Sequence, residues 1–536
     1  MNKLSIAALV CVAALVLGSW PAAADTLQVR FYSDQGLVSV LREAPDGADL
    51  PIAAAKALVA GPDGEEAAIG FKSALPEGTR LMSADVTGET IKLDLSPEVL
   101  EGLDEARLTE IFDQFKATLG DFPWIMSIRL TCKGELLSTY LPVGPAVGTA
   151  APTEIPKSVG LAGLGGRNIT IGPSHGRFWN GSGWYWQRSD PCGYGEAVLE
   201  DTNSIRLMQF LYQSLAQDGA TVHVPRELNE SNCCNGYTGL AWWKMAAYSW
   251  LRANGLPCSV WANSSGNCGE ETATGRSSDD IRARPKFADY RGSNIYIAHH
   301  TNAGGGTGME TFRDTAMEYP AHEANSYTLA LNVHNNTLDA IHEMYDGSFA
   351  NRGVKDSAGG FGEIRIPNRP ACLVELAFHD KCDKDALYLK DDFFRSVAMW
   401  GMYKGICSYF GASPTWDKYS DEYVSTTIPS TMESGKSYTV SVTFRNRGVL
   451  WRADRAFRLG AVGDSDPFTS ATRPSMSGDV RPGNTYTFTL PLTAPGPGTS
   501  TTDWRMLRDG VAGFGAPLSK PVPETGPTPQ APPLPT

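Results

Sequence analysis

The stretch Ala371-Cys-Leu-Val-Glu-Leu-Ala-Phe378 places one carboxylate in the middle of an apolar run. A run of this length and composition is typical of a buried β-strand. Alternation along a strand puts Cys372, Val374 and Leu376 on one face and turns Glu375 to the other. A charge at such a position is costly unless a cation or a reaction needs it there. This strand is therefore the first indicator of both fold and function.

The residues alone leave two interpretations of Glu375 open. It is either a catalytic carboxylate beside a cation, or a half-buried carboxylate paired with an arginine such as Arg352 or Arg365. Metal-ligand residue types stand at other strand and helix ends, namely His175, Glu200 and the pair His299-His300. Zinc hydrolases use three such side chains and leave a fourth position for water, whose proton a nearby carboxylate accepts. No short ligand motif is present, so spacing alone does not decide between the two interpretations.

Strand-like and helical patterns alternate between residues 167 and 411. The strand patterns cover residues 168–171, 221–224, 295–298 and 371–378, and long helical patterns cover residues 200–217, 325–345 and 391–409. This order predicts an α/β domain with a central, mostly parallel sheet flanked by helices. Active sites in such sheets gather where strands end and loops begin.

Five segments of this region, in order, resemble the zinc-dependent N-acetylmuramoyl-L-alanine amidases. They are Asn168-Ile-Thr-Ile-Gly-Pro-Ser-His-Gly176, Glu200-Asp-Thr-Asn203, Ile297-Ala-His-His-Thr-Asn302, Asn351-Arg-Gly-Val-Lys355 and Leu373-Val-Glu-Leu-Ala-Phe378. The resemblance implies that His175, Glu200 and His300 hold Zn²⁺ and that Glu375 is the general base. It also implies hydrolysis of the amide between N-acetylmuramic acid and L-alanine in peptidoglycan.

The match departs from the family pattern at both histidines. The usual Asp-x-Gly-His-Gly-Gly stands here as Gly172-Pro-Ser-His-Gly-Arg177, and the usual Ser-x-His-x-Asn stands as Ala298-His-His-Thr-Asn302. We assign His300 because it keeps the spacing to the following asparagine, with His299 in reserve. Glu200 is preferred to Glu196 because it opens the amphipathic helix.

Two further domains are expected around this one. Residues 25–142 read as an α+β domain that resembles the GerMN domain of sporulation and germination proteins, and they show no residues that would carry out chemistry. Residues 143–166 read as a flexible linker rich in glycine and proline. Residues 412–516 predict a β-sandwich that resembles the Ig-like next-to-BRCA1 central domain, and residues 517–536 predict a proline-rich disordered tail.

The start of the chain and its cysteines indicate export. Residues 1–24 have the charged, apolar and small-residue regions of a signal peptide, so we expect a periplasmic or extracellular protein. Nine cysteines would remain in the mature chain, which suits an oxidising compartment and leaves at least one free thiol. No later run predicts a transmembrane segment.

The formal net charge of -13 gives no electrostatic footprint for nucleic acid. The expected partner is peptidoglycan as substrate, with envelope proteins as further candidates through the flanking domains. Two other functions remain open: a zinc carboxypeptidase or endopeptidase of the stem peptide, and a non-catalytic protein that binds the cell envelope.

Overall fold

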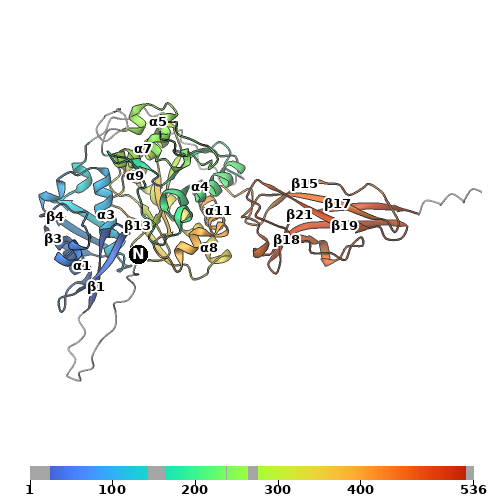
Figure 1. Cartoon of the computed structure of the whole chain (residues 1–536), viewed down its shortest axis with the longest axis horizontal. Helices are drawn as coiled ribbons and strands as arrows, with labels where there is room; N and C mark the ends of the chain where they lie inside the picture. The colour runs from blue at the N-terminus through green and yellow to red at the C-terminus, as the bar shows by residue number, and fades with distance from the viewer. Residues whose placement is uncertain (1–24, 143–162, 237, 263–267, 269–275, 527–536) are drawn as a thin grey trace, which may run out of the picture.

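The computed structural model describes residues 25–142, 163–236, 238–262, 268 and 276–526 (Figure 1). The predicted signal peptide, most of the predicted linker and the last ten residues lie outside this range. In Figure 1 the N-terminal domain lies against the middle domain, and the C-terminal domain extends from the opposite side. The described residues include no helix with the length and apolarity needed to cross a bilayer.

The N-terminal domain is an α+β unit, as predicted. Its elements are β1 (Thr26–Ser33), β2 (Gly36–Glu43), α1 (Leu50–Ala60), α2 (Gly64–Ala68), β3 (Leu81–Thr87), β4 (Thr90–Leu95), η1 (Pro97–Leu100), α3 (Glu105–Leu119), β5 (Ser127–Cys132), β6 (Glu135–Leu136) and η2 (Leu137–Tyr140). The long helix α3 begins at Asp104, whose side chain accepts a hydrogen bond from the backbone N–H of Arg107 and so caps the helix.

The middle domain alternates strands and helices. Its strands are β7 (Asn168–Pro173), β8 (Phe178–Trp179), β9 (Trp184–Tyr185), β10 (Thr221–His223), β11 (Ile295–Asn302), β12 (Met309–Arg313), β13 (Asn351–Asp356) and β14 (Ala371–Phe378). Its helices are η3 (Gly195–Ala197), α4 (Glu200–Gln217), η4 (Trp242–Lys244), α5 (Ala247–Ala253), α6 (Cys258–Trp261), α7 (Arg276–Tyr290), η5 (Pro320–His322), α8 (Glu323–Met344), α9 (Gly362–Arg365), α10 (Asp385–Lys390) and α11 (Asp392–Tyr409).

One ten-stranded sheet runs through both domains. Its order is β10-β7-β11-β14-β12-β13-β5-β4-β3, with β6 paired to β5. Within this sheet the pairs between described middle-domain strands are parallel except β12–β14, so the predicted mostly parallel sheet is confirmed. The junction between the domains is the parallel pair Asp356–Ser127 of β13 and β5. The N-terminal domain therefore extends the middle domain's sheet.

Strand β14 is buried along its whole length. On one face Cys372, Val374 and Leu376 belong to a core that includes side chains of α4, α8 and α11. On the other face Leu373 belongs to a core that is made mostly by the N-terminal domain. The alternation predicted for this strand is confirmed. The N-terminal domain supplies most of the layer over its second face, which the sequence did not predict.

Helix α3 is the element that joins the two domains. Phe112 packs edge-on against Phe312 of β12 and Phe361, with ring centroids 6.4 and 4.8 Å away. The buried carboxylate of Glu105 pairs with Arg282 and Arg365 of the middle domain. The helix is thus fixed by aromatic packing and by a buried ion-pair network.

The C-terminal domain is a β-sandwich. Its elements are β15 (Asp421–Thr426), β16 (Met432–Glu433), β17 (Ser437–Asn446), η6 (Ala453–Arg455), β18 (Phe457–Ala461), η7 (Val462–Asp464), β19 (Thr485–Thr493), β20 (Gly498–Arg508) and β21 (Ala512–Thr525). The sheets β15-β17-β19 and β16-β21-β20-β18 enclose a core that includes the fully buried Trp451 and Trp504. The sandwich fold is as predicted, whereas the kinship with the Ig-like family stays a prediction.

The predicted start of the disordered tail at Pro517 is wrong. Strand β21 continues to Thr525 and pairs with β20 over most of its length. Pro521 and Pro523 lie opposite Thr501 and Thr499 of β20, so these prolines belong to the paired part of the strand. Proline content alone therefore misplaced this boundary.

Replacing Phe112 with alanine tests the junction between the domains. Because this buried ring touches two rings of the middle domain, the variant should lose about 3–5 kcal/mol of unfolding free energy in denaturant titrations. Replacing the exposed Ile69 with alanine should change it by less than about 0.5 kcal/mol. Equal effects of the two substitutions would contradict the role assigned to α3.

Candidate metal centre

His175 stands in the loop that follows β7. It has a positive φ of 51°, and the next residue, Gly176, has φ 107°. A Cβ on Gly176 would lie 2.7 Å from the backbone of Ala246 and from the Arg226 guanidinium, so the loop needs glycine there. The buried Arg226 donates to the carbonyl oxygens of Ser174 and Asp201 and fixes the loop against α4. His175 is consequently held in one place, with only 3 % of its surface exposed.

Glu200 is the first residue of α4, and its carboxylate is buried. Its Oε1 accepts a hydrogen bond from the backbone N–H of Thr301 at 3.2 Å, and its Oε2 lies 3.4 Å from Arg188 Nε. A carboxylate at the start of a helix also faces the positive end of the helix dipole. These contacts favour an ionised Glu200.

His300 comes from the end of β11, and both of its ring nitrogens face carboxylates. Nε2 lies 2.7 Å from Glu363 Oε1, and Nδ1 lies 3.0 Å from Glu200 Oε1. Glu363 is itself held by the Tyr296 hydroxyl and Arg284. An N–H on Nε2 that donates to Glu363 leaves the Nδ1 lone pair facing Glu200 and His175, as in metal-bound histidines.

The ligand atoms of His175, Glu200 and His300 lie within 4.8 Å of one another. All three side chains are buried. Neither ring nitrogen of His175 has a hydrogen-bond partner among the described residues, although Nε2 lies 3.4 Å from Glu200 Oε1. A buried imidazole without partners is costly, and a cation would satisfy it. This set of two histidines and one carboxylate suits Zn²⁺.

Burial and neighbouring charges set the protonation of this cluster. Burial and the nearby Arg188 lower the pKa of His175 to about 3, so its imidazole is neutral, as a metal ligand must be. Burial opposes a charge on His300, but Glu363 and Glu200 raise its pKa to about 9. The two histidines lower the pKa of Glu200 despite its burial. Two carboxylates thus supply a negative field that would attract a cation.

Glu375 lies beside His300 because β11 and β14 pair in parallel register at these two residues. Its Oε1 accepts a hydrogen bond from Lys116 Nζ at 2.7 Å, and its Oε2 has no hydrogen-bond partner in the described part of the chain. Burial raises the pKa of Glu375, against the opposing effect of Lys116. The predicted arginine partners are elsewhere, since Arg352 pairs with Glu310 and Arg365 with Glu105. The sequence therefore missed the lysine that neutralises this carboxylate.

A cavity of about 620 Å³ opens over these residues. Its lining includes the metal-ligand cluster and Glu375 from the middle domain, and Tyr32, Thr109, Glu110, Asp113 and Lys116 from the N-terminal domain. Helix α3 of the N-terminal domain thus forms a wall of this cavity, while the expectation that this domain carries out no chemistry stays a prediction. The periodicity of α3 could have pointed to a buried Lys116, since lysine follows the apolar Phe112 and Phe115 on that helix.

The structure separates the candidates that the sequence left open. His299 is fully buried and its Nδ1 lies 3.4 Å from the Ser204 hydroxyl, so it faces away from the cluster. Glu196 lies on the surface side and pairs with Lys244. His379 also lines the cavity.

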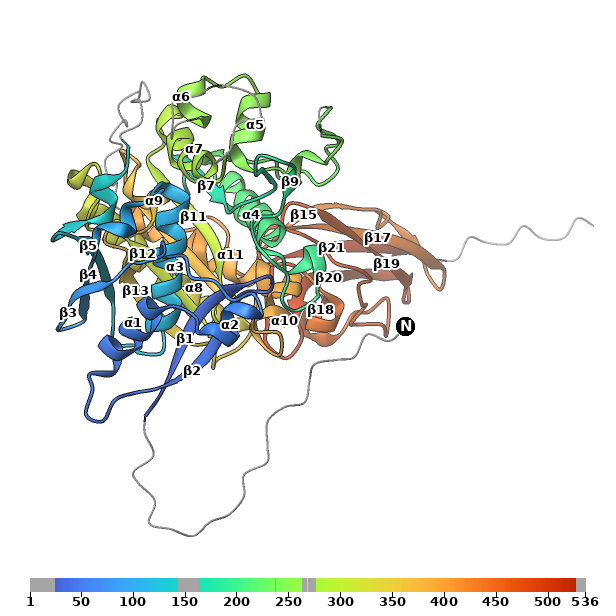
Figure 2. The same ribbon diagram turned by 60° about the vertical axis from the view of Figure 1, so that its left-hand side comes forward.

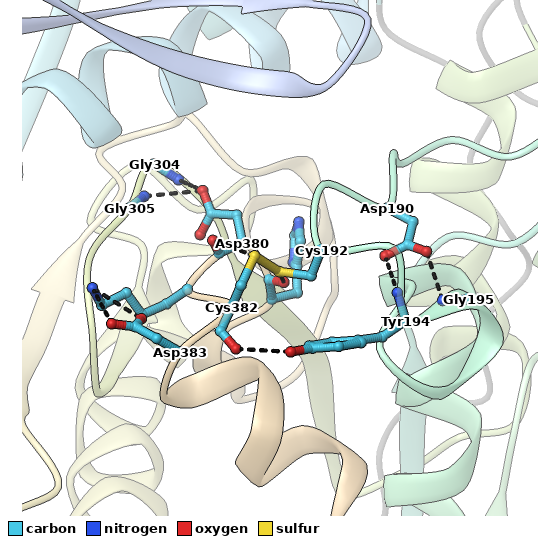
Figure 3. Close-up of a disulfide and its surroundings, with 11 residues drawn as sticks. Asp190, Cys192, Tyr194, Gly195, Gly304, Gly305, Asp380, Cys382 and Asp383 are labelled. Carbon is cyan, nitrogen blue, oxygen red and sulfur yellow. Dashed lines mark hydrogen bonds and ion pairs between the residues drawn. A yellow bond between two sulfur atoms is a disulfide. The ribbon is translucent and has the colours of Figure 1, made fainter. Parts of the chain in front are cut away.

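A disulfide ties together two loops that line the cavity (Figure 3). Cys192 follows the segment of Arg188, and Cys382 follows His379. The Tyr194 hydroxyl donates to the Cys382 carbonyl at 3.2 Å, and Asp380 accepts bonds from the backbone N–H groups of Gly304 and Gly305.

Further disulfides join Cys233 to Cys234 and Cys258 to Cys268. Cys132, Cys372 and Cys407 are buried free thiols, so the prediction of at least one free thiol is confirmed.

Two segments of the chain match models of known protein families. Residues 28–138 match the family described as sporulation and spore germination, and residues 261–408 match the family described as N-acetylmuramoyl-L-alanine amidase. The amidase match contains His300 and Glu375, whereas His175 and Glu200 precede it.

Parts of the chain are also similar to individual proteins and solved structures. A sporulation-specific N-acetylmuramoyl-L-alanine amidase of Bacillus subtilis is 31% identical over 119 residues, which are 22% of this chain and 41% of that protein. The chain thus spans less than half the length of this curated relative. Among solved structures, the N-acetylmuramyl-L-alanine amidase of Mycobacterium abscessus covers 46% of this chain and 99% of its own, with 14% identity and a TM-score of 0.30. The first GerMN domain of the sporulation protein GerM of Bacillus subtilis covers 21% and 85%, with 20% identity and a TM-score of 0.18.

Removing the disulfide beside the cavity should destabilise the middle domain. A chain with Cys192→Ser and Cys382→Ser should lose about 2–5 kcal/mol of unfolding free energy, because the bond closes a loop of 190 residues. The matched pair Cys258→Ser and Cys268→Ser opens a loop of only 10 residues and should cost less. Chemical denaturation of the two double variants measures both values, and a larger loss in the short-loop pair would contradict the expectation.

Proposed function

We propose that this protein is a zinc-dependent N-acetylmuramoyl-L-alanine amidase that hydrolyses the amide between N-acetylmuramic acid and L-alanine in peptidoglycan. The observation that carries the proposal is the buried cluster of His175, Glu200 and His300 beside Glu375, on a cavity of about 620 Å³. The family match over residues 261–408 supports the choice of reaction.

His175, Glu200 and His300 would hold the zinc ion through two nitrogens and one carboxylate oxygen. Zinc in such a site lowers the pKa of water and polarises a carbonyl group. Glu363 keeps the proton of His300 on Nε2 and so leaves Nδ1 free as a ligand atom. The burial of all three side chains excludes water from most of the site and strengthens each charge interaction.

Glu375 is the proposed general base. Its Oε2 has no hydrogen-bond partner in the described part of the chain, so it is the atom that can accept a proton from the attacking water. The same oxygen can then deliver that proton to the nitrogen of the departing L-alanine, which leaves as an amine. The burial that raises its pKa brings this group nearer to the proton affinity that such a relay needs.

We also propose that the mature protein acts outside the cytoplasm, since its substrate would be the cell wall. The signal-peptide pattern of residues 1–24 and the disulfide between Cys192 and Cys382 support this location. The N-terminal and C-terminal domains would then be the parts available to envelope proteins.

Incubation of the protein with peptidoglycan tests the reaction. The products should be free stem peptides that begin with L-alanine, identified by mass spectrometry, and a zinc chelator should abolish their release. Cleavage between two amino acids would instead identify a stem-peptide peptidase. Zinc at full occupancy without any released product would identify a non-catalytic envelope-binding protein, and either outcome would refute the proposal.

Two substitutions separate the proposed base from the proposed ligands. Glu375→Gln should retain zinc but reduce kcat by about 10²–10⁴-fold, because the amide cannot accept the proton. His175→Ala should lose both zinc and turnover, since it removes one of three ligands. Metal content by mass spectrometry and kcat on a soluble muramyl peptide are the two readouts, with the exposed Glu135→Gln as the control. Turnover that persists in Glu375→Gln would remove the base assignment.

A further inference from the structure

We propose that Lys116 of the N-terminal domain is a positioning residue of the amidase site, which holds Glu375 by one oxygen and leaves the other free for proton transfer. The N-terminal domain would thus complete the active site. This inference rests on the proposed function.

The contact between the two residues is short and buried. Lys116 Nζ donates to Glu375 Oε1 at 2.7 Å, and the two side chains are 7% and 6% exposed. The residues are 259 positions apart in the sequence. A buried carboxylate on an apolar strand needs a charge partner, and the described residues place no arginine on it.

Side chains of both domains fix the lysine. Asp113 Oδ1 lies 3.1 Å from Nζ, one helical turn away on α3. The ammonium also lies 5.3 Å from the ring centroid of Phe361 and 5.7 Å from that of Phe312. Burial opposes the charge, but Asp113 and Glu375 raise the pKa of Lys116, so the ammonium persists. The lysine is therefore a fixed cation rather than a mobile surface group.

The two oxygens of Glu375 are unequal as a result. Oε1 is bound to the ammonium, whereas Oε2 is buried and has no hydrogen-bond partner within the described ranges. A general base must hold one lone pair towards the proton that it accepts, and a displacement of about 1 Å can cost about a hundredfold in rate. Lys116 restrains the rotation of the carboxylate that would move Oε2 away.

The lysine does not fill the site. Lys116, Glu375 and the cluster of His175, Glu200 and His300 line the same cavity of about 620 Å³. Glu110 and Tyr32 line it as well, so the N-terminal domain forms a wall and leaves space for a substrate between the domains. Figure 2 shows α3 beside the middle domain, on the side of β12 and α9. This geometry favours a supporting role over a blocking one.

The test uses the full-length chain and measures kcat, KM, zinc content and melting temperature for each variant. The variants are Lys116→Met, Lys116→Gln and Lys116→Arg, together with Glu375→Gln and the double variant Lys116→Met/Glu375→Gln. The control is Lys92→Met, which removes an exposed lysine of the same domain. The substrate is a soluble muramyl-L-alanyl peptide.

We expect Lys116→Met and Lys116→Gln to lower kcat by about a hundredfold, with KM changed by less than about threefold and zinc retained. Lys116→Arg should recover most of the turnover because the guanidinium can still bind Oε1. In the double variant the lysine substitution should add nothing to the loss caused by Glu375→Gln, as expected for residues that act as a unit.

Three results would overturn the proposal. Unchanged turnover in the folded Lys116→Gln or Lys116→Met chain would show that the lysine has no catalytic effect. Increased turnover would identify Lys116 as an inhibitory latch. Losses that multiply in the double variant would show that the lysine does not act through Glu375. Failure of the proposed function is distinct, because then the unaltered chain and every variant would release no product.

Discussion

The structure depends on the stabilisation of one buried carboxylate on β14. Glu375 lies on a strand covered on both faces, where an isolated charge would be too costly to retain. The ammonium of Lys116 offsets that cost through its hydrogen bond to Glu375. Since Lys116 belongs to α3, the ion pair that offsets the cost of burying this carboxylate also joins the two domains. The packing of α3, the extended sheet and the cavity wall are all arranged around this pair.

The assignment of His175, Glu200, His300 and Glu375 came from the resemblance to a known family and stays a prediction. Strand alternation and helix starts were enough to predict the α/β fold of the middle domain. They succeed because the α/β sheet and its loops follow local pattern rules. Glu375 and His300 are neighbours through strand register, which the alternation of each strand anticipates only in part. The pairing of His300 with Glu363 depends on α9, which no pattern around Glu363 predicts. The sequence therefore indicated which residues could form the site, whereas their contact partners could be identified only from the fold.

The larger misjudgement concerned the N-terminal domain. A stretch of glycine, proline and alanine after Pro142 favours independent domains, yet β5 pairs with β13 and Phe112 packs among rings of the middle domain. Interfaces of this kind carry no local signature, because an apolar helix face looks the same whether it covers its own domain or another. The tail shows the same limit, since Pro521 and Pro523 read as disorder but lie within β21, in register with β20.

The separation of 259 residues between Lys116 and Glu375 has a consequence for the order of assembly. During synthesis α3 emerges first, and at about 5–20 residues per second roughly 10–50 s pass before its partner strand exists. During that interval the middle domain does not yet cover the apolar face of α3 that carries Phe112. Lys116, which is buried in the folded protein, is also still exposed. The nascent N-terminal domain thus exposes this face until the second half of the chain has been synthesised.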